Sequence, residues 1–169
     1  MNKTTIRMMN DNDPERISEA FRIQGWDKPT DQYVKYEEEQ KNGKIVSLIA
    51  EVEGDFAGYV NIAWESNYPY FKENNIPEIQ DFNVLIKYRR HGIGTMLMDK
   101  CEEIIGERFE ISGLGVGLFG DYGAAQSLYV HRGYVPDSKG IYKHGGYIQY
   151  GQEVVVDDDL NMYFVKKLR

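Results

Sequence analysis

Apolar residues near the start of the chain recur three and four positions apart, which is the spacing of an α-helix buried on one face. This pattern predicts a helix over residues 14–24, with Asp13-Pro14 as its start and Gly25 as its stop. A second helix is expected from Thr30, read as its N-terminal cap, to Gly43. The chain is therefore expected to begin with two amphipathic helices.

From residue 45 onward, short runs rich in β-branched and aromatic residues alternate with helical patterns. Strands are expected over residues 45–52, 56–64, about 78–86, 109–119, 141–150 and 160–167, and helices over 92–106 and 123–131. The first two strands form a hairpin, the last two form an antiparallel pair, and residues 65–77 are read as a loop. This order predicts a mixed α/β fold (an α+β mixed sheet) with helices on both faces.

An apolar, strand-like run joins an amphipathic helix through Arg89-x-x-Gly92-x-Gly94. Glycines leave the backbone open to a phosphate, and the first turn of a helix offers unpaired N–H groups and the positive end of its dipole. Arg89 and Arg90 add positive charge. The junction, which we call the cradle (residues 89–95), therefore predicts a site for a diphosphate.

Other phosphate-binding motifs fit less well. Thr95-Met96 stands where a P-loop needs Lys-Ser/Thr, and Leu97 stands where a dinucleotide fingerprint needs a third glycine. A later run from Gly115 to Gly120 does match G-x-G-x-x-G, but the 49 residues after it are too few to complete a doubly wound domain. We interpret Gly115 and Gly117 as thinning one face of a strand so that a ligand arm can lie against it. A nucleotide-binding oxidoreductase is the alternative.

Two signatures in the right order resemble those of the GNAT N-acetyltransferase superfamily. Its acetyl-CoA signature, Q/R-x-x-G-x-G/A between a strand and a helix, is matched by residues 89–94. Its second signature, A-x-x-L-Y-x-x-x-G-Y/F, is matched by residues 125–134. The resemblance covers roughly residues 45–134. It implies a GNAT-like acyltransferase fold, with a largely antiparallel sheet that splays between its fourth and fifth strands to admit the pantetheine arm of acetyl-CoA.

The resemblance also implies which residues hold acetyl-CoA. They are Val84, Leu85, Ile86, Arg89, Arg90, His91, Gly92, Ile93, Gly94, Thr95, Tyr122 and Ala125. A backbone N–H near Val84 or Leu85 is the family's usual donor to the thioester carbonyl. Tyr122 departs from the family pattern, because members often carry Asn there, and any contact credited to that Asn is in question.

The reaction needs a base for the amine and an acid for the leaving thiolate. Glu78 lies eleven residues before Arg89, the spacing at which histone-type members of the superfamily keep a catalytic glutamate. It is the first candidate for the base, and Asp81 is the second, acting directly or through water. Tyr129 matches the family's thiolate-protonating tyrosine. Because neither motif contains a nucleophilic cysteine, direct attack in a ternary complex is expected.

Aromatic residues in two loops, among them Trp26 and Tyr70, are expected to wall the acceptor site. The run of three aspartates at 157–159 is read as a solvated turn that can also attract a cationic amine. The histidines at 91, 131 and 144 share no ligand spacing with a cysteine or carboxylate cluster, so no metal site is expected.

Composition narrows the class of protein. A length of 169 residues fits a single domain, over residues 1–169. The net charge of −7 disfavours a nucleic-acid partner, and no apolar run has the length of a membrane span or a signal peptide. The lone Cys101 fits a reducing compartment. A cytoplasmic monomer or homodimer is therefore expected.

The hypothesis from sequence is an acetyl-CoA-dependent N-acetyltransferase that acts on a primary amine of a small molecule. Two alternatives remain open: a non-catalytic sensor that binds acyl-CoA, and a peptide or protein N-acetyltransferase. Acceptor loops carry no transferable motif, so the sequence does not name the amine.

Overall fold

The computed structural model describes residues 3–169, and the contacts along the chain divide it into two compact units. The first unit comprises the chain up to Trp64 together with Ile79–Ile104. The second unit comprises Glu65–Glu78 together with Ile105–Arg169. Each unit is therefore assembled from two stretches that are separated in sequence.

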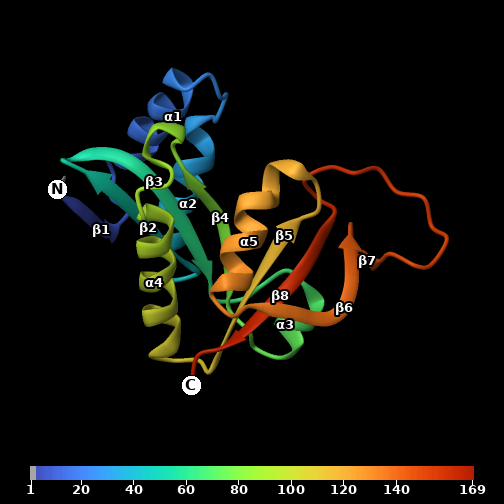
Figure 1. The fold of residues 1–169 in the computed structure, drawn as a ribbon. Coiled ribbons are helices and arrows are strands. Elements are labelled where there is room, and N and C mark those ends of the chain that lie inside the picture. Colours follow the sequence, from blue (N-terminus) through green and yellow to red (C-terminus); the bar gives the residue numbers. More distant parts are fainter. Residues whose placement is uncertain (1–2) are drawn as a thin grey trace. The chain divides into compact units, whose positions relative to one another are not determined.

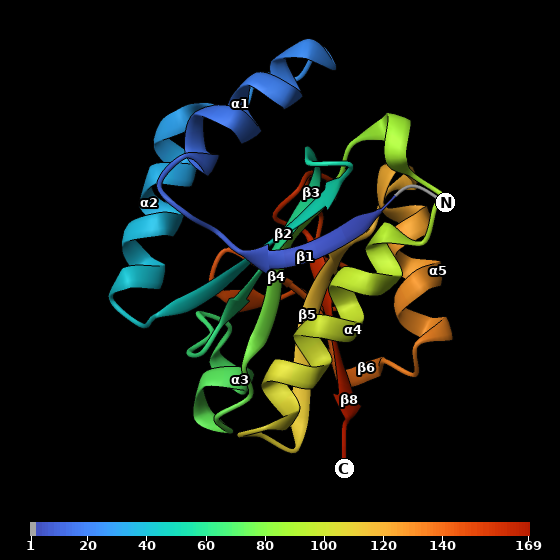
Figure 2. The same ribbon diagram turned by 90° about the vertical axis from the view of Figure 1, so that its left-hand side faces the viewer.

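The first unit carries strands with helices on both of their faces. Its elements are β1 (Thr4–Met8), α1 (Asp13–Ile23), α2 (Thr30–Lys41), β2 (Ile45–Val52), β3 (Asp55–Ala63), β4 (Glu78–Val84), the 3₁₀ turn η1 (Ile86–Tyr88) and α4 (Ile93–Gly106). The strands follow one another in the order β1-β2-β3-β4, and the β1–β2 and β2–β3 pairs are antiparallel. Helices α1 and α2 cover one face and α4 covers the other (Figure 1; Figure 2).

Strand β1 was not expected from the sequence. It pairs along β2 from Thr4 opposite Val52 to Met8 opposite Leu48. Its own residues are mostly polar or threonine, so its stability as a strand comes from the partner's hydrogen bonds and not from its own apolar pattern.

The acidic residue at the start of α1 has a different role from the expected cap. The N-cap is Asn12, and the Asp13 side chain, 1% exposed, accepts hydrogen bonds from Arg7 at 2.6 and 2.8 Å. Arg7 also pairs with Glu51 of β2 at 2.7 Å, and this hydrogen bond lowers the pKa of Glu51. An ion network therefore ties β1, α1 and β2 together. Thr30 is likewise the first helical residue of α2, after Pro29 as N-cap.

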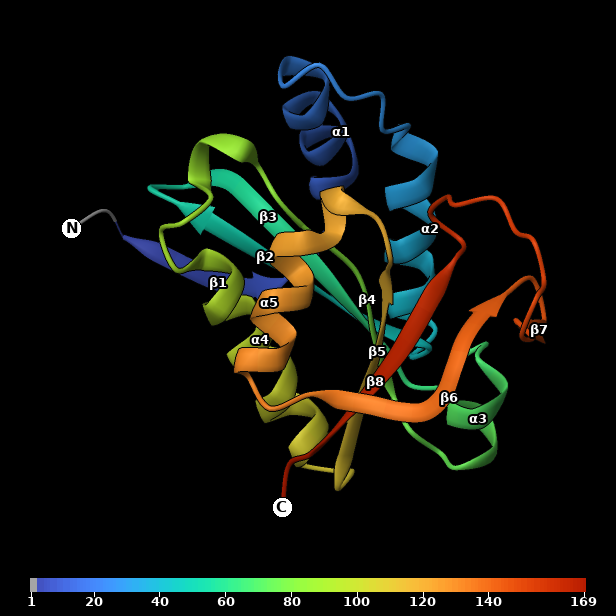
Figure 3. The ribbon, with the colours of Figure 1, turned by 45° about the vertical axis from the view of Figure 1, so that its right-hand side comes forward.

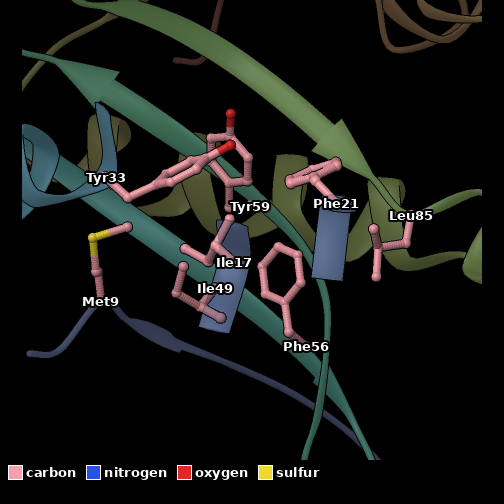
Figure 4. Close-up of a cluster of buried hydrophobic side chains, with 8 residues drawn as sticks. All are labelled: Met9, Ile17, Phe21, Tyr33, Ile49, Phe56, Tyr59 and Leu85. Atoms are coloured by element: carbon pink, nitrogen blue, oxygen red, sulfur yellow. The ribbon is translucent and has the colours of Figure 1, made fainter. Parts of the chain in front are cut away.

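The core of the first unit lies between its two N-terminal helices and its strands. Figure 4 shows eight buried side chains from α1, α2, β2, β3 and the segments next to them: Met9, Ile17, Phe21, Tyr33, Ile49, Phe56, Tyr59 and Leu85. The rings of Phe21 and Tyr59 meet edge to face at 6.1 Å. Burying a side chain such as Phe21 contributes roughly 1.5–3 kcal/mol. The hydroxyl groups of Tyr33 and Tyr59 lie on the same side of this cluster (Figure 4).

The second unit is also a mixture of strands and helices. Its elements are α3 (Pro69–Glu73), β5 (Ile111–Gly117), the 3₁₀ turn η2 (Gly120–Tyr122), α5 (Gly123–His131), β6 (Val135–Lys143), β7 (Gly146–Tyr147) and β8 (Asn161–Lys167). The strand order is β5-β8-β6-β7, with every pair antiparallel. Figure 3 shows β8 between β5 and β6. The expected loop 65–77 contains α3, and the strand expected at residue 141 begins earlier, at Val135.

The glycines of β5 make room for aromatic rings of their own unit. A Cβ at Gly115 would stand 2.9 Å from the ring of Tyr163, and one at Gly117 would collide with the ring of Tyr122. A Cβ at Gly113 would collide with Phe71. The expectation that Gly115 and Gly117 clear space for a ligand arm is therefore replaced by a packing explanation.

The fold class expected from the sequence is confirmed: a mixed α/β arrangement, largely antiparallel, with helices on both faces. The splay between the fourth and fifth strands of the family's sheet stays a prediction. Within residues 3–169, no helix combines the length and the apolar character needed to cross a membrane.

Gly58 of β3 lies where the backbone of β4 passes closely. A Cβ at this position would stand 2.6 Å from the carbonyl oxygen of Asn83 and 3.1 Å from Cα of Val84. Because both obstacles are backbone atoms, Gly58→Ala should lower the free energy of unfolding by about 1–3 kcal/mol, measured by chemical denaturation.

The matched control is Gly123→Ala. Gly123 has a helical φ of −56°, and beyond its own helical turn and chain neighbours no described atom lies within 4 Å of its Cβ position. This change should be neutral or slightly stabilising. Equal losses in the two variants would contradict a tight β3–β4 approach.

Candidate active site

The cradle is a left-handed turn that leads into a long helix. Strand β4 ends at Val84, η1 follows, and α4 begins at Ile93. Gly92 has φ +80° and Arg90 has φ +62°, which is the conformation that glycine adopts without strain. Around the Cβ position of Gly92, no described atom lies within 4 Å.

The cradle has the properties that a diphosphate requires. The side chains of Arg89, Arg90 and His91 are exposed, as is Thr95. The first N–H groups of α4 have no partners within the helix and lie at the positive end of its dipole. The diphosphate of coenzyme A therefore fits this segment.

Gly94, the second glycine of the motif, is required for helix packing. A Cβ at Gly94 would stand 3.0 Å from the ring of Phe82 in β4. Gly94 therefore lets α4 approach β4, and Gly92 is the glycine that keeps the cradle open. Ile93 between them is buried at 2% exposure, so it can offer a ligand only its backbone.

Arg89 and Trp26 belong to one cluster. The Nε of Arg89 donates to the carbonyl oxygen of Val84 at 3.1 Å, and its guanidinium carbon lies 5.7 Å from the centre of the Trp26 ring. Trp26 also stacks on Phe21, with ring centres 5.8 Å apart. Trp26, which was expected to wall the acceptor site, is thus placed beside the cradle residue Arg89.

Two of the backbone groups expected to serve the cofactor are engaged within the chain. The N–H of Leu85 donates to the carbonyl of Ala57 at 2.9 Å. The N–H of Ile86 donates to the side-chain oxygen of Gln24 at 2.7 Å. Both amide protons are therefore already used in hydrogen bonds within the first unit. The sequence motifs gave no sign of Gln24, which lies just after α1.

The side chains of Leu85 and Ile86 line a pocket of the first unit. Its volume is about 580 Å³, and Ile23 and Phe56 are among its other apolar lining residues. Ile86 is half exposed and Ile23 is 75% exposed. A pocket of this size and character falls in the range of small-molecule sites.

Asp81 is the centre of a hydrogen-bond network in the first unit. Its Oδ2 accepts hydrogen bonds from Tyr59 at 2.6 Å, Tyr36 at 2.7 Å and Gln32 at 3.1 Å. Its Oδ1 accepts one from Asn83 at 3.1 Å. The backbone of Asp81 is left-handed, with φ +47°, in the middle of β4.

This network changes the interpretation of Asp81. Burial raises the pKa of Tyr59 and of Tyr36, and the negative charge of Asp81 raises each further, so both phenols stay protonated and donate. A carboxylate has about four acceptor sites, and four donors already point at this one. Asp81 is therefore better suited to hold β4 and α2 together than to take a proton.

Glu78 lies at the start of β4, and the contacts place it in the second unit. It is 8% exposed, and its Oε2 accepts a hydrogen bond from the hydroxyl of Ser66. Burial raises the pKa of Tyr163, and the charge of Glu78 is the next largest cause. Glu78 is thus a buried carboxylate that can accept a proton if an amine reaches it.

Tyr129 of α5 is also buried, at 6% exposure. Its ring lies 6.2 Å from that of Tyr134, whose hydroxyl is 3.0 Å from the hydroxyl of Ser112. Tyr122, before α5, donates to Asp158 at 2.9 Å, and Ala125 is partly exposed. These candidates all belong to the second unit, whereas Asp81 and the cradle belong to the first.

Tyr70 packs in an aromatic cluster of the second unit. It is partly buried against Tyr68 and Phe71, and the ammonium of Lys139 lies 4.8 Å from its ring centre. A cation already occupies one face of this ring. Its expected role at the acceptor site therefore stays a prediction.

The structure brings together side chains that looked unrelated in the sequence. His144, Asp157 and Asp159 place their ligand atoms within 4.8 Å of one another. Lys143 pairs with Asp157 at 2.6 Å, and this hydrogen bond lowers the pKa of Asp157. A lysine therefore competes with any cation for this exposed group.

Comparison with known protein families identifies the family to which the two signatures belong. Residues 8–134 match the model of the Acetyltransferase (GNAT) family. The chain belongs to this family, and it is an acetyltransferase that takes its acetyl group from acetyl-CoA. A search among curated proteins finds no match.

Solved structures share the fold at low sequence identity. A GNAT-family protein from Desulfovibrio desulfuricans aligns with a TM-score of 0.73 and 12% identity, over 99% of this chain and 100% of the other. A protein from Salmonella typhimurium, solved with its cofactor acetyl-CoA, gives 0.68 and 17%, over 98% and 94%. A ribosomal-protein-alanine N-acetyltransferase from Brucella melitensis gives 0.68 and 18%, over 96% and 99%.

Replacing the central acceptor of the network tests its structural role. Asp81→Asn removes the charge and one acceptor, so the free energy of unfolding should fall by about 1.5–3 kcal/mol. Asp27→Asn, on an exposed loop residue, should change it by less than about 0.5 kcal/mol. A loss in Asp81→Asn no greater than in the control would show that the network does not hold the unit together.

The cradle is tested by calorimetric titration with coenzyme A. Gly92→Ala puts a side chain on a left-handed residue at the diphosphate, and affinity should fall at least about tenfold, or 1.4 kcal/mol. Gly43→Ala has the same backbone strain, at φ +71°, in the turn after α2 and should leave affinity unchanged. Equal affinity in all three proteins would remove the cradle from the cofactor site.

Proposed function

We propose that this acetyltransferase acts on a primary amine of a small molecule by direct attack in a ternary complex. The observation that carries the proposal is the open left-handed turn at Gly92 before α4, together with a buried carboxylate, Glu78, at the start of the strand that leads to it. We further propose that residues 1–169 work as one domain.

When bound, acetyl-CoA supplies the acetyl group as a thioester. The residues that would hold its diphosphate are Arg89, Arg90 and His91, with the N–H groups at the start of α4. Arg89 is already held in place by Val84 and Trp26, so little side-chain freedom is lost when it meets an anion.

Glu78 is proposed as the general base. An amine attacks only in its neutral form, and a carboxylate within reach of the ammonium can accept its proton, directly or through water. Its place in the interior of the second unit, at the first residue of the strand that leads to the cradle, favours this role. Asp81 is the second candidate, and its four donors argue against it.

Tyr129 is proposed as the general acid. Its hydroxyl holds the proton that the leaving sulfur needs, and its burial keeps bulk water from competing for that role. Cys101 is fully buried in α4, which argues against a covalent acetyl-enzyme at this residue.

The acceptor is proposed to be cationic, since the chain has a net charge of −7 and would attract a protonated amine. The same charge argues against nucleic acid as a partner. We propose a cytoplasmic monomer or homodimer. Peptide acetylation is the main alternative, supported by the similarity of the fold to the ribosomal-protein-alanine N-acetyltransferase of Brucella melitensis.

The base assignment predicts a specific loss. Glu78→Gln should lower kcat about 10²–10⁴-fold with little change in coenzyme A affinity, because an amide cannot accept the amine's proton. Release of coenzyme A thiol is the measurement, with polyamines, aminoglycosides, amino acids and peptide N-termini as acceptors.

Tyr129→Phe keeps the ring and removes the proton donor, so kcat should fall while coenzyme A affinity is retained. If only peptides are acetylated, the small-molecule proposal is wrong and the protein is a peptide N-acetyltransferase. If acetyl-CoA is hydrolysed only slowly in the presence of every amine, and neither Glu78→Gln nor Tyr129→Phe changes that rate, the acyl-CoA sensor would be the remaining alternative.

A further inference from the structure

A side chain outside the sequence motifs reaches the carboxyl group of Glu78. Ser66, in the segment before α3, is 1% exposed, and its hydroxyl donates to Oε2 of Glu78. The hydroxyl oxygen of Ser66 itself accepts a hydrogen bond from the N–H of Tyr68 at 3.0 Å. Because that N–H approaches as a donor, the single proton of the Ser66 hydroxyl is directed at Glu78.

Tyr68, whose N–H donates to Ser66, is itself held by several contacts. The hydroxyl of Tyr68 donates to Asp137 at 2.6 Å and accepts from Tyr147 at 3.1 Å. Its ring stacks on Tyr163, with centres 3.6 Å apart and planes 3° from parallel. With Tyr68 anchored in this way, its N–H fixes the position of the Ser66 oxygen.

We propose that Ser66 is a positioning residue for Glu78. Its hydroxyl holds the carboxylate in one orientation and stabilises the ionised form, which is the form that accepts a proton. The catalytic consequence depends on the proposed role of Glu78 as base, whereas the contact between the two side chains does not.

Glu78 is one of several titratable groups of the second unit whose charges act on Tyr163 of β8. The others are Tyr142 and Asp137 of β6, and Asp159 before β8. Carboxylates nearby disfavour a further negative charge. The hydrogen bond from Ser66 acts against them, so its loss should favour the protonated form of Glu78.

The contact is tested without substrate, by carbon-13 NMR of the free protein labelled at the glutamate carboxyl carbons. The Glu78 signal is assigned by its absence in Glu78→Gln. In Ser66→Ala the titration midpoint of Glu78 should move up by about one pH unit. Ser66→Thr, which keeps the hydroxyl, should restore it.

Ser112→Ala is the matched control. Ser112 is fully buried in the same unit, and its hydroxyl bonds a neutral partner, Tyr134. Ser112→Ala should lower the free energy of unfolding by about as much as Ser66→Ala does, without moving the titration midpoint of Glu78. If Ser66→Ala fails to fold, Ser66→Cys, a weaker donor, should give a smaller upward shift. An unchanged midpoint in the folded variant would overturn the proposal.

The catalytic consequence appears in the pH dependence of kcat/KM with an amine from the acceptor screen. The base works above its midpoint, so the acidic limb should move to higher pH in Ser66→Ala and return in Ser66→Thr. An active Glu78→Gln would remove the base assignment but leave the NMR test standing. An inactive Glu78→Gln, with the acidic limb unmoved in Ser66→Ala, would refute only the role of Ser66.

Discussion

The first unit depends on the hydrogen bonds that converge on the half-buried carboxylate of Asp81. Its donors come from α2 (Tyr36) and β3 (Tyr59), and Asp81 itself lies in β4. Hydroxyl and amide donors satisfy the charge, which would be costly if it were buried without them. Asp81 is also the residue of β4 with a left-handed backbone, so the network holds the strand at the point where its backbone departs from regular extended geometry.

The second unit uses the same chemistry for its own acids. Asp137 accepts from Tyr68, and Glu78 accepts from Ser66. The chain has 13 tyrosines, and among them Tyr36, Tyr59 and Tyr68 pack their rings in the two cores and donate their hydroxyl protons to carboxylates. A hydroxyl donor orients a carboxylate without adding a positive charge, so the acid keeps its ability to take up a proton.

Much of the fold was predictable because the spacing of apolar residues that marks a helix or a strand lies within a short stretch of sequence. The helices at α1, α2, α4 and α5 and most strands lie where the pattern placed them. Strand β1 and helix α3 were missed, since the first depends on hydrogen bonds to β2 and the second on packing of Phe71 and Tyr68 in the aromatic cluster. The caps expected at Asp13 and Thr30 were wrong, because each is the first residue inside its helix: Asn12 and Pro29 occupy the N-cap positions, and the Asp13 carboxylate pairs with Arg7.

The sequence by itself identified the family and predicted the cradle, because both signatures consist of residues that are neighbours along the chain. Only the tertiary structure decided which donors the two acids meet. Asp81 receives donors from residues up to 49 positions away, and Glu78 receives the Ser66 hydroxyl from 12 positions away. Hydrogen bonds of this kind are set by which elements pack together, so no local pattern reports them. Spacing alone ranked Glu78 before Asp81 as a candidate base, and it reported neither the Ser66 hydroxyl at Glu78 nor the four donors at Asp81.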